Sequence, residues 1–199
     1  MKLYYSPGAC SLSPHIVAQE AGIPIELEKV DLKSHKTETG EDFYAINPKG
    51  YVPALKLDDG TILTEGPAIV SYLADQKPQS GLMPTGVDRY KTLSWLAFIN
   101  SELHKTFGPL FGEISDDAKK ETIEKLKKRF VHAENQLDGR DYLMGKTFSV
   151  ADAYLFVMLT WARHMKIDLS SFPNLTAFFQ RVAHRPSVHA AMKAEGLVQ

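Results

Sequence analysis

Short apolar runs separated by turn residues characterise the first part of the chain. The hydrophobic pattern and its stop signals predict strands at residues 3–5, 25–32, 54–57 and 61–63, and helices at 11–21 and from 64 onward. Asp58-Asp59-Gly60 is typical of the turn of a β-hairpin. Pro67 stands in the first turn of the second helix, where a missing N–H costs little. The order β-α-β followed by β-β-α indicates an α/β domain.

The spacing of apolar residues changes after the Pro/Gly-rich connector 77–86. Beyond it, apolar residues recur every three or four positions, which predicts helices at 88–111, around 126–137, at 153–161, at 174–183 and at 187–194. Ser149 and Asp152 form a capping-box pattern before the third of these helices, with Asp in place of the usual Glu or Gln. We therefore predict two domains, 1–80 and 87–199, with the linker at 77–86 and only helices in the second domain.

Composition and charge limit the classes of function that the chain can have. Hydrophobic residues make up 44% and charged residues 24% of the chain, and 23 basic residues nearly balance 24 acidic ones, so no global field favours nucleic acid or an anionic membrane. The basic stretch 119–129 is interleaved with Glu121 and Glu124, which indicates a solvated helix face. No apolar segment approaches the roughly 20 residues that cross a bilayer, and no signal peptide is recognisable. We expect a soluble cytoplasmic protein with neither nucleic-acid nor membrane partners.

Cys10 is the single cysteine, and it lies between a predicted strand and a predicted helix. A thiol at a helix start faces unpaired N–H groups and the positive end of the helix dipole, which favour thiolate; the alternative is a small buried hydrophobe. Cys10-Ser11-Leu12-Ser13 lacks the second thiol of a Cys-x-x-Cys motif, so exchange would need an external sulfur. Ser11 and Tyr5 carry hydroxyl groups able to hydrogen-bond a bound thiolate, or they serve as helix cap and core aromatic.

Three further positions each have two interpretations, one as part of a functional site and one as an ordinary structural feature. Pro53 after Val52 is either a trans turn or a cis bond that presents backbone groups to a ligand. Glu65-Gly66 at a helix start complements the dipole or binds a ligand ammonium and carboxylate. His104 flanks an apolar helix stripe, where histidines are often structural. The other six histidines show no metal-ligand spacing, so we expect no metal site.

Taken together, these segments resemble the bacterial, cysteine-containing beta class of glutathione transferases, over nearly the whole chain. The resemblance is carried by residues 1–5 with 7–12, 47–50 with 52–55, 57–60, 63–66, 101–105 and 149–155. It implies a thioredoxin-like α/β N-terminal domain followed by an all-α C-terminal domain. It also implies glutathione as co-substrate and a homodimer.

The resemblance also assigns roles to residues. It implies that Val52, before a cis Pro53, binds the cysteinyl backbone of glutathione, and that Glu65 and Gly66 hold the γ-glutamyl end. Cys10 and His104 would be the catalytic residues beside the sulfur. The remaining glutathione contacts it implies are His35, Ser101, Glu102 and Leu103, with Glu102 and its neighbours reaching the partner subunit's ligand. Relatives often carry lysine at position 35, which leaves open whether His35 or Lys36 contacts the glycyl carboxylate.

The implied activity is conjugation of the glutathione thiolate to electrophilic, mostly apolar small molecules, a detoxification reaction. Phe107, Phe111 and Trp161 are the candidate wall of the second pocket. The alternative is thiol-disulfide exchange, peroxidase or reductive dehalogenase activity through a Cys10–glutathione mixed disulfide. A non-enzymatic ligand-binding or interaction module is a third interpretation. The sequence does not name the electrophile, nor rank Cys10, Ser11 and Tyr5 as thiolate stabilisers.

Overall fold

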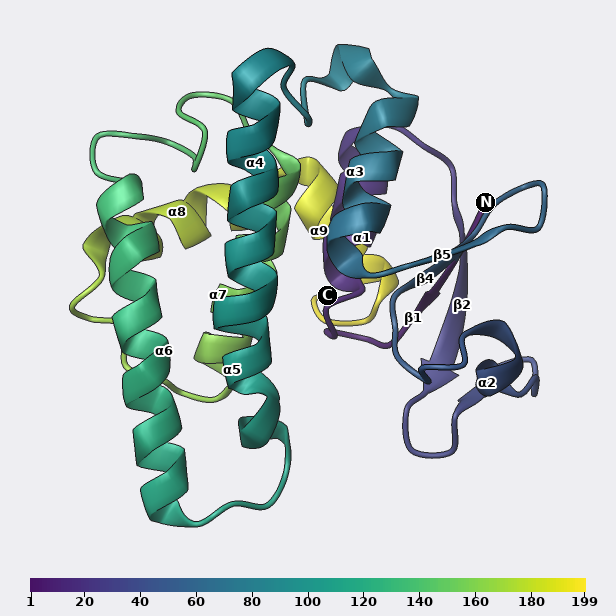
Figure 1. Cartoon of the computed structure of the whole chain (residues 1–199), viewed down its shortest axis with the longest axis horizontal. Helices are drawn as coiled ribbons and strands as arrows, with labels where there is room; N and C mark the ends of the chain where they lie inside the picture. The colour runs from purple at the N-terminus through teal and green to yellow at the C-terminus, as the bar shows by residue number, and fades with distance from the viewer. The chain divides into compact units, whose positions relative to one another are not determined.

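The alternating apolar residues of the first part of the chain assemble into one five-stranded sheet (Figure 1). The computed structural model describes all 199 residues. The strands are β1 Lys2–Tyr5, β2 Glu26–Asp31, β3 Lys36–Thr37, β4 Ala54–Lys56 and β5 Ile62–Thr64, in the spatial order β3-β2-β1-β4-β5. β1 is parallel to β2 and antiparallel to β4, and β4 and β5 form the predicted hairpin.

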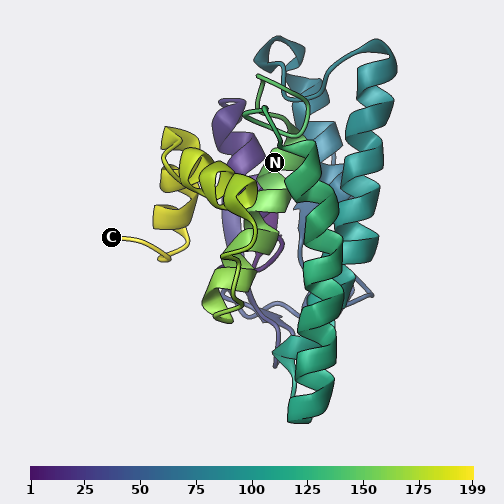
Figure 2. The same cartoon turned by 90° about the vertical axis from the view of Figure 1, so that its left-hand side faces the viewer.

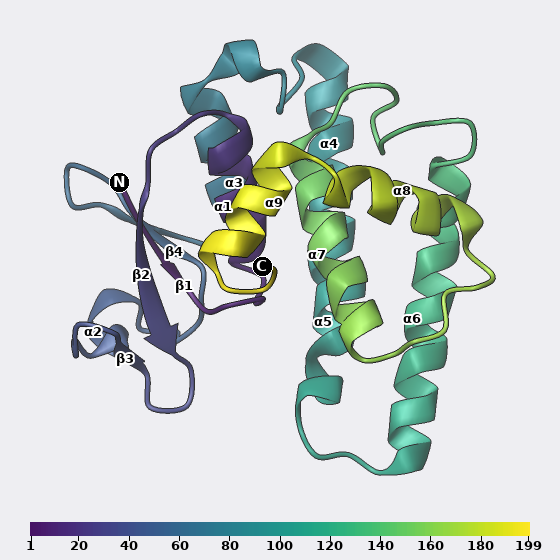
Figure 3. The ribbon, with the colours of Figure 1, turned by 180° about the vertical axis from the view of Figure 1, so that it is seen from behind.

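Helices accompany this sheet in the first of two structural units, which comprises Met1–Met83 and Ala183–Gln199. The helices are α1 Leu12–Glu20, α2 Phe43–Ile46, α3 Gly66–Gln76 and α9 Pro186–Ala194, with a 3₁₀ turn at Pro78–Ser80. α1 packs against both α3 and α9, an arrangement visible from behind in Figure 3. Leu12, Ile16 and Val17 of α1 are fully buried, so this short helix is held by packing rather than by its own propensity.

The predicted elements of this unit form, with two additions. β3 and α2 lie in the stretch 33–50, where no hydrophobic periodicity predicted them. Phe43 explains α2, because its side chain is fully buried in a cluster with Tyr4, Val30, Val52 and Ala54. The parallel β-α-β unit followed by a hairpin and a helix is the predicted thioredoxin-like arrangement.

The second unit, Pro84–Val182, is built from helices alone. Its elements are α4 Gly86–Phe98, a π-helical segment Ile99–His104, α5 Lys105–Phe107, a 3₁₀ turn Gly108–Phe111, α6 Asp116–Gln136, α7 Val150–His164 and α8 Pro173–Ala183. Figure 2 shows α6 along its full length. All but one of the residues 150–159 in α7 are apolar, and all are buried, which makes α7 the central helix of this unit.

Two departures from the sequence interpretation concern this part of the chain. The single helix predicted at 88–111 is interrupted by the π-helical segment and the 3₁₀ turn. The sequence does not reveal this interruption, because apolar spacing of three and four does not distinguish these windings. Residues 183–199 were predicted within the second domain, whereas the structure groups them with the first unit.

The predicted capping box at the start of α7 is confirmed. The fully buried Asp152 carboxylate accepts hydrogen bonds from the Ser149 N–H (2.8 Å), the Ser149 hydroxyl (2.6 Å) and the Leu143 N–H (2.8 Å). Burial nevertheless raises the pKa of Asp152 to about 6, against these three donors. Separately, none of the helices is both long and apolar enough to cross a membrane.

Candidate active site

Cys10 occupies the turn between β1 and α1, two residues before the helix begins. Its thiol donates a hydrogen bond to the backbone carbonyl of Val52, with Sγ and O 3.2 Å apart. Val52 precedes Pro53 through a cis peptide bond, as the resemblance implied. Residues 42 positions apart in the chain therefore meet at one sulfur.

The protonation of Cys10 differs from the sequence prediction. Cys10 retains some exposed surface, but protein surrounds the sulfur closely enough that desolvation raises the pKa of the thiol to about 12. The backbone N–H groups of Cys10 and Ser11 act in the opposite direction, and the negative charge of Glu65 raises the pKa further. The prediction of a thiolate was therefore wrong for Cys10 itself. The donors at the helix start exist, but desolvation outweighs them, and the group is a neutral thiol at pH 7.

The two neighbouring hydroxyl groups have different surroundings. Ser11 is fully buried, and its Oγ both accepts from the Ser6 N–H and donates to the Ser6 carbonyl, each at 3.2 Å. This pair of bonds closes the turn that carries Cys10. Tyr5 is buried at the end of β1, and burial raises the pKa of its phenol, which keeps it a neutral hydrogen-bond donor.

A buried contact from the far end of the chain holds the same turn. The Glu195 carboxylate accepts from the Gly8 N–H through Oε2 (2.9 Å), and its Oε1 lies 2.9 Å from Nδ1 of His15 in α1. The Glu195 and His15 side chains are almost fully excluded from solvent. Gly8 has φ +70°, and a Cβ added there would lie 3.4 Å from Leu197. Sequence reasoning missed this anchor, since nothing near Glu195 links it to a position 187 residues earlier.

Glu65 is the residue immediately before α3 and has φ +70°, an unusual conformation for a residue other than glycine. Its carboxylate pairs with the Lys49 ammonium (2.5 Å), which also donates to the Thr64 hydroxyl at 2.9 Å. Gly66 follows as the first residue of the 11-residue helix. The sequence interpretation gave Lys49 no role, although it lies in the segment 47–50 that carried the resemblance.

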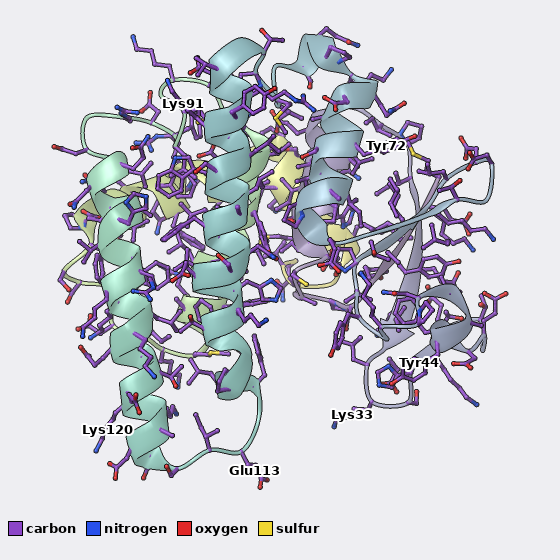
Figure 4. All side chains as sticks on the ribbon, viewed as in Figure 1. Lys33, Tyr44, Tyr72, Lys91, Glu113 and Lys120 are labelled. Atoms are coloured by element: carbon purple, nitrogen blue, oxygen red, sulfur yellow. The ribbon has the colours of Figure 1, made fainter.

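His35 lies in the loop after β2 with φ +51°. Its ring packs against the Tyr44 ring of α2 at a tilt of 33°, with centroids 4.5 Å apart; Tyr44 is labelled in Figure 4. The buried Nδ1 of His35 has no hydrogen-bond partner. Gly50 fits against this pair because a Cβ there would come within 2.6 Å of the Tyr44 ring. Lys36 lies in the edge strand β3 and is exposed.

The remaining predicted site residues share the π-helical segment Ile99–His104 of the second unit. The exposed Ser101 donates to the Ala97 carbonyl (2.9 Å), and the Glu102 carboxylate pairs with Arg129 of α6 at 2.6 Å. Leu103 is fully buried, so its side chain belongs to the core of this unit and is closed to a ligand.

His104 is held by two aromatic residues of α7. Its Nδ1 lies 2.5 Å from the Tyr154 hydroxyl, and that hydroxyl donates to Oδ1 of Asn100 at 2.9 Å. The His104 ring also meets the Trp161 ring edge-on, with centroids 5.0 Å apart. Trp161 in turn contacts Phe107 and Phe111 edge-on, so the three aromatic residues predicted as a pocket wall form one cluster. Phe111 is the exposed member.

The first unit thus carries Cys10, His35, Val52, Pro53, Glu65 and Gly66, and the second carries Ser101, Glu102, Leu103 and His104. Within the first unit, Cys10 is hydrogen-bonded to Val52 and its thiol senses the charge of Glu65. The fold gathers no group of three or more His, Cys, Asp or Glu side chains suited to a metal ion.

Comparisons with known proteins agree with the fold of the two units. The family models for the glutathione S-transferase N-terminal and C-terminal domains match residues 8–76 and 93–186. Glutathione S-transferase GstA of Escherichia coli O157:H7 is 46% identical over 200 residues, covering 99% of this chain and 100% of the relative. A sphingomonad glutathione S-transferase solved in complex with glutathione superposes with TM-score 0.95 at 52% identity, over 100% of both chains. The bacterial beta class enzyme of Sphingomonas chungbukensis gives TM-score 0.95 at 51% identity, again over 100% of both chains.

Proposed function

This chain belongs to the glutathione S-transferase family and is a transferase, and from that premise we propose which of its residues hold glutathione and activate its thiol. Val52 pairs through its backbone with the cysteinyl residue of glutathione. Glu65 binds the γ-glutamyl ammonium, and the N–H groups at the start of α3, beginning with Gly66, bind the adjacent carboxylate. His35 or Lys36 meets the glycyl carboxylate, and His104 acts beside the glutathione sulfur as the second catalytic residue.

The hydrogen bond from the Cys10 thiol to the Val52 carbonyl carries this proposal. A ligand that pairs with the Val52 backbone brings its own cysteinyl group to the position next to the Cys10 sulfur. The charge of Glu65 acts on the same sulfur, so a ligand ammonium bound to Glu65 belongs to the same small region. A γ-glutamyl-cysteinyl peptide carries these two features in the required order.

Once glutathione is bound, the single S–H of Cys10 turns from the Val52 carbonyl to the sulfur of glutathione, and Cys10 serves there as a neutral donor. With a pKa of about 12, it remains protonated at pH 7 and is not itself the nucleophile. A hydrogen bond from an S–H to a bound thiolate stabilises the charged form and lowers the pKa of the ligand thiol. The thiolate attacks an electrophilic carbon and expels the leaving group. The same protonated state disfavours the alternative in which Cys10 attacks a disulfide.

The second substrate and the assembly complete the proposal. We place an apolar electrophile against the cluster of Phe107, Phe111 and Trp161, whose exposed member is Phe111. A homodimer in which Glu102 serves the partner's ligand is the assembly the family relationship favours. A cytoplasmic location fits a chain whose single cysteine forms no internal disulfide.

Calorimetry with glutathione tests the ligand assignment. Glu65→Gln should weaken binding by roughly tenfold to a hundredfold, the usual effect of losing a hydrogen bond to a charged group. Glu26→Gln is the matched control, since Glu26 is an equally exposed carboxylate paired with a lysine, Lys2, in the same unit. Equal affinities for the two variants would refute the role of Glu65. Failure of the wild type to bind glutathione would revive the non-enzymatic interpretation.

Cys10→Ala separates the two enzymatic interpretations. Conjugation of an aryl halide should persist at a reduced rate, because the variant loses one donor to the sulfur. Reduction of a small disulfide, by contrast, requires the Cys10 sulfur and should disappear if it occurs in the wild type. Complete loss of conjugation in a folded variant would show that Cys10 does more than orient the ligand.

A further inference from the structure

A chain of two hydrogen bonds fixes where the ring proton of His104 sits. The Tyr154 hydroxyl donates its single proton to Oδ1 of Asn100 (2.9 Å), so its oxygen can only accept from Nδ1 of His104, 2.5 Å away. We infer that Asn100 and Tyr154 are positioning residues that hold His104 in the Nδ1–H tautomer and make Nε2 its basic nitrogen.

Burial makes this arrangement selective. Tyr154 lies in α7 with about 1% of its surface exposed, so its hydroxyl has little access to water and depends on these two partners. In the opposite tautomer, Nδ1 carries no proton. Its lone pair would then face the lone pairs of the Tyr154 oxygen, because the Tyr154 hydroxyl proton is donated to Asn100. Leaving buried polar groups unsatisfied in this way biases the two tautomers by roughly tenfold or more.

The local fold explains how both partners reach one hydroxyl. Asn100 and His104 lie four positions apart in the π-helical segment Ile99–His104, and both side chains contact Tyr154. π-helical turns inside helices frequently occur at functional sites, where they redirect side chains. The Trp161 ring, edge-on to His104 at 5.0 Å, restricts the imidazole further.

The consequence for the reaction rests on the proposed role of His104 beside the glutathione sulfur. The thiol proton of glutathione passes to Nε2, and the ring becomes an imidazolium that keeps its Nδ1–H bond to Tyr154. The thiolate left behind attacks the electrophile, and the imidazolium later releases its proton to solvent. A tautomer with the proton already on Nε2 could not accept it there.

Nuclear magnetic resonance of the ¹⁵N-labelled histidine side chains tests the tautomer directly. The His104 signals are assigned by their loss in His104→Gln. We expect Nδ1 to be the protonated nitrogen in the wild type. Asn100→Ala frees the Tyr154 proton to turn toward Nδ1, so the tautomer should reverse. Asn100→Asp keeps an acceptor at the same place and should retain the wild-type tautomer. A role for Asn100 in packing alone would not separate these two variants in this way.

Steady-state conjugation kinetics connect the tautomer to the reaction. Tyr154→Phe and Asn100→Ala should lower kcat by roughly tenfold, a fraction of what general base catalysis usually contributes, while KM for glutathione stays unchanged. Asn100→Asp should restore kcat. Tyr142→Phe is the matched control, because it changes another buried tyrosine of the same unit whose ring meets Phe148 and Phe178 edge-on rather than contacting His104.

The outcomes separate this inference from the proposed function. A wild-type His104 protonated on Nε2, or a tautomer unchanged in Asn100→Ala, overturns the inference. So does a loss of activity in His104→Ala without any loss in Tyr154→Phe, although the proposed role of His104 then stands. Full activity in His104→Ala instead refutes that proposed role, and with it the catalytic consequence drawn here.

Discussion

Asp152→Asn should change how stability depends on pH, because the wild-type carboxyl is fully buried at the start of α7. Its pKa rises from 3.8 to about 6, which means that the folded protein disfavours the ionised form by about 3 kcal/mol. The folded state therefore binds this proton more tightly than the unfolded chain does. Stability contributed by the protonated form is fully present below pH 3.8 and is lost as the pH rises through about 6.

The magnitude follows from these two values. Between about pH 4.5 and pH 7, the free energy of unfolding of the wild type minus that of Asp152→Asn should fall by about 2 kcal/mol. Any loss that the amide causes by leaving one of the three donors unsatisfied is constant with pH and drops out of the slope. The difference isolates Asp152 from every other group that titrates in this range.

Urea unfolding followed by tryptophan fluorescence measures this difference. Both tryptophans, Trp95 and Trp161, lie in the same unit as Asp152. Asp168→Asn is the control, since the exposed Asp168 has a lowered pKa, caused chiefly by its hydrogen bond from the Ser170 N–H, and completes its titration below this pH range. A difference that stays flat for Asp152→Asn would refute the reasoning, because the three donors would then outweigh desolvation.

Three further predictions concern the turn that carries Cys10. Thiolate absorbance of the ligand-free protein should appear only toward pH 12, as desolvation dictates, and a midpoint below pH 9 would contradict this. Glu195→Ala should lower the free energy of unfolding by about 3 kcal/mol, because it leaves the partly buried Gly8 N–H and the buried His15 without this partner. Chemical denaturation measures the loss, and a change below about 0.5 kcal/mol would argue against the anchor. Gly8→Ala should cost about 1 kcal/mol through its positive φ, measured in the same way, and unchanged stability would show that the turn relaxes.

The success of the sequence interpretation depended on how local each signal is. The β-hairpin at Asp58-Asp59-Gly60 and the capping box of Ser149 and Asp152 are written within a few residues, and both formed. α2 was missed because four residues are too few to show a period. It forms because Phe43 is buried and because the Asp42 side chain accepts a hydrogen bond from the Tyr44 N–H at its start. The π-helical segment was missed because one wide turn leaves the apolar spacing intact.

The site showed the same limit. Cys10 and Val52 were found from their motifs, but the protonation of Cys10 depends on how much protein surrounds the sulfur, which no motif states. The partners Lys49, Tyr154 and Glu195 were missed because each is an ordinary residue whose importance comes from a contact. Tyr154 lies 50 positions from His104, and Glu195 lies 187 positions from Gly8, beyond the reach of any local pattern.

The return of residues 183–199 to the first unit has a consequence for biosynthesis. Domains generally fold as they leave the ribosome, beginning at the amino end, but the sheet-bearing unit lacks α9 and Glu195 until the whole second unit, residues 84–182, has been made. The first unit therefore closes only after the second unit has been synthesised. A fragment of residues 1–83 alone would lack the Glu195 carboxylate that anchors Gly8. We expect such a fragment to be incompletely folded and therefore open to chaperones and proteases.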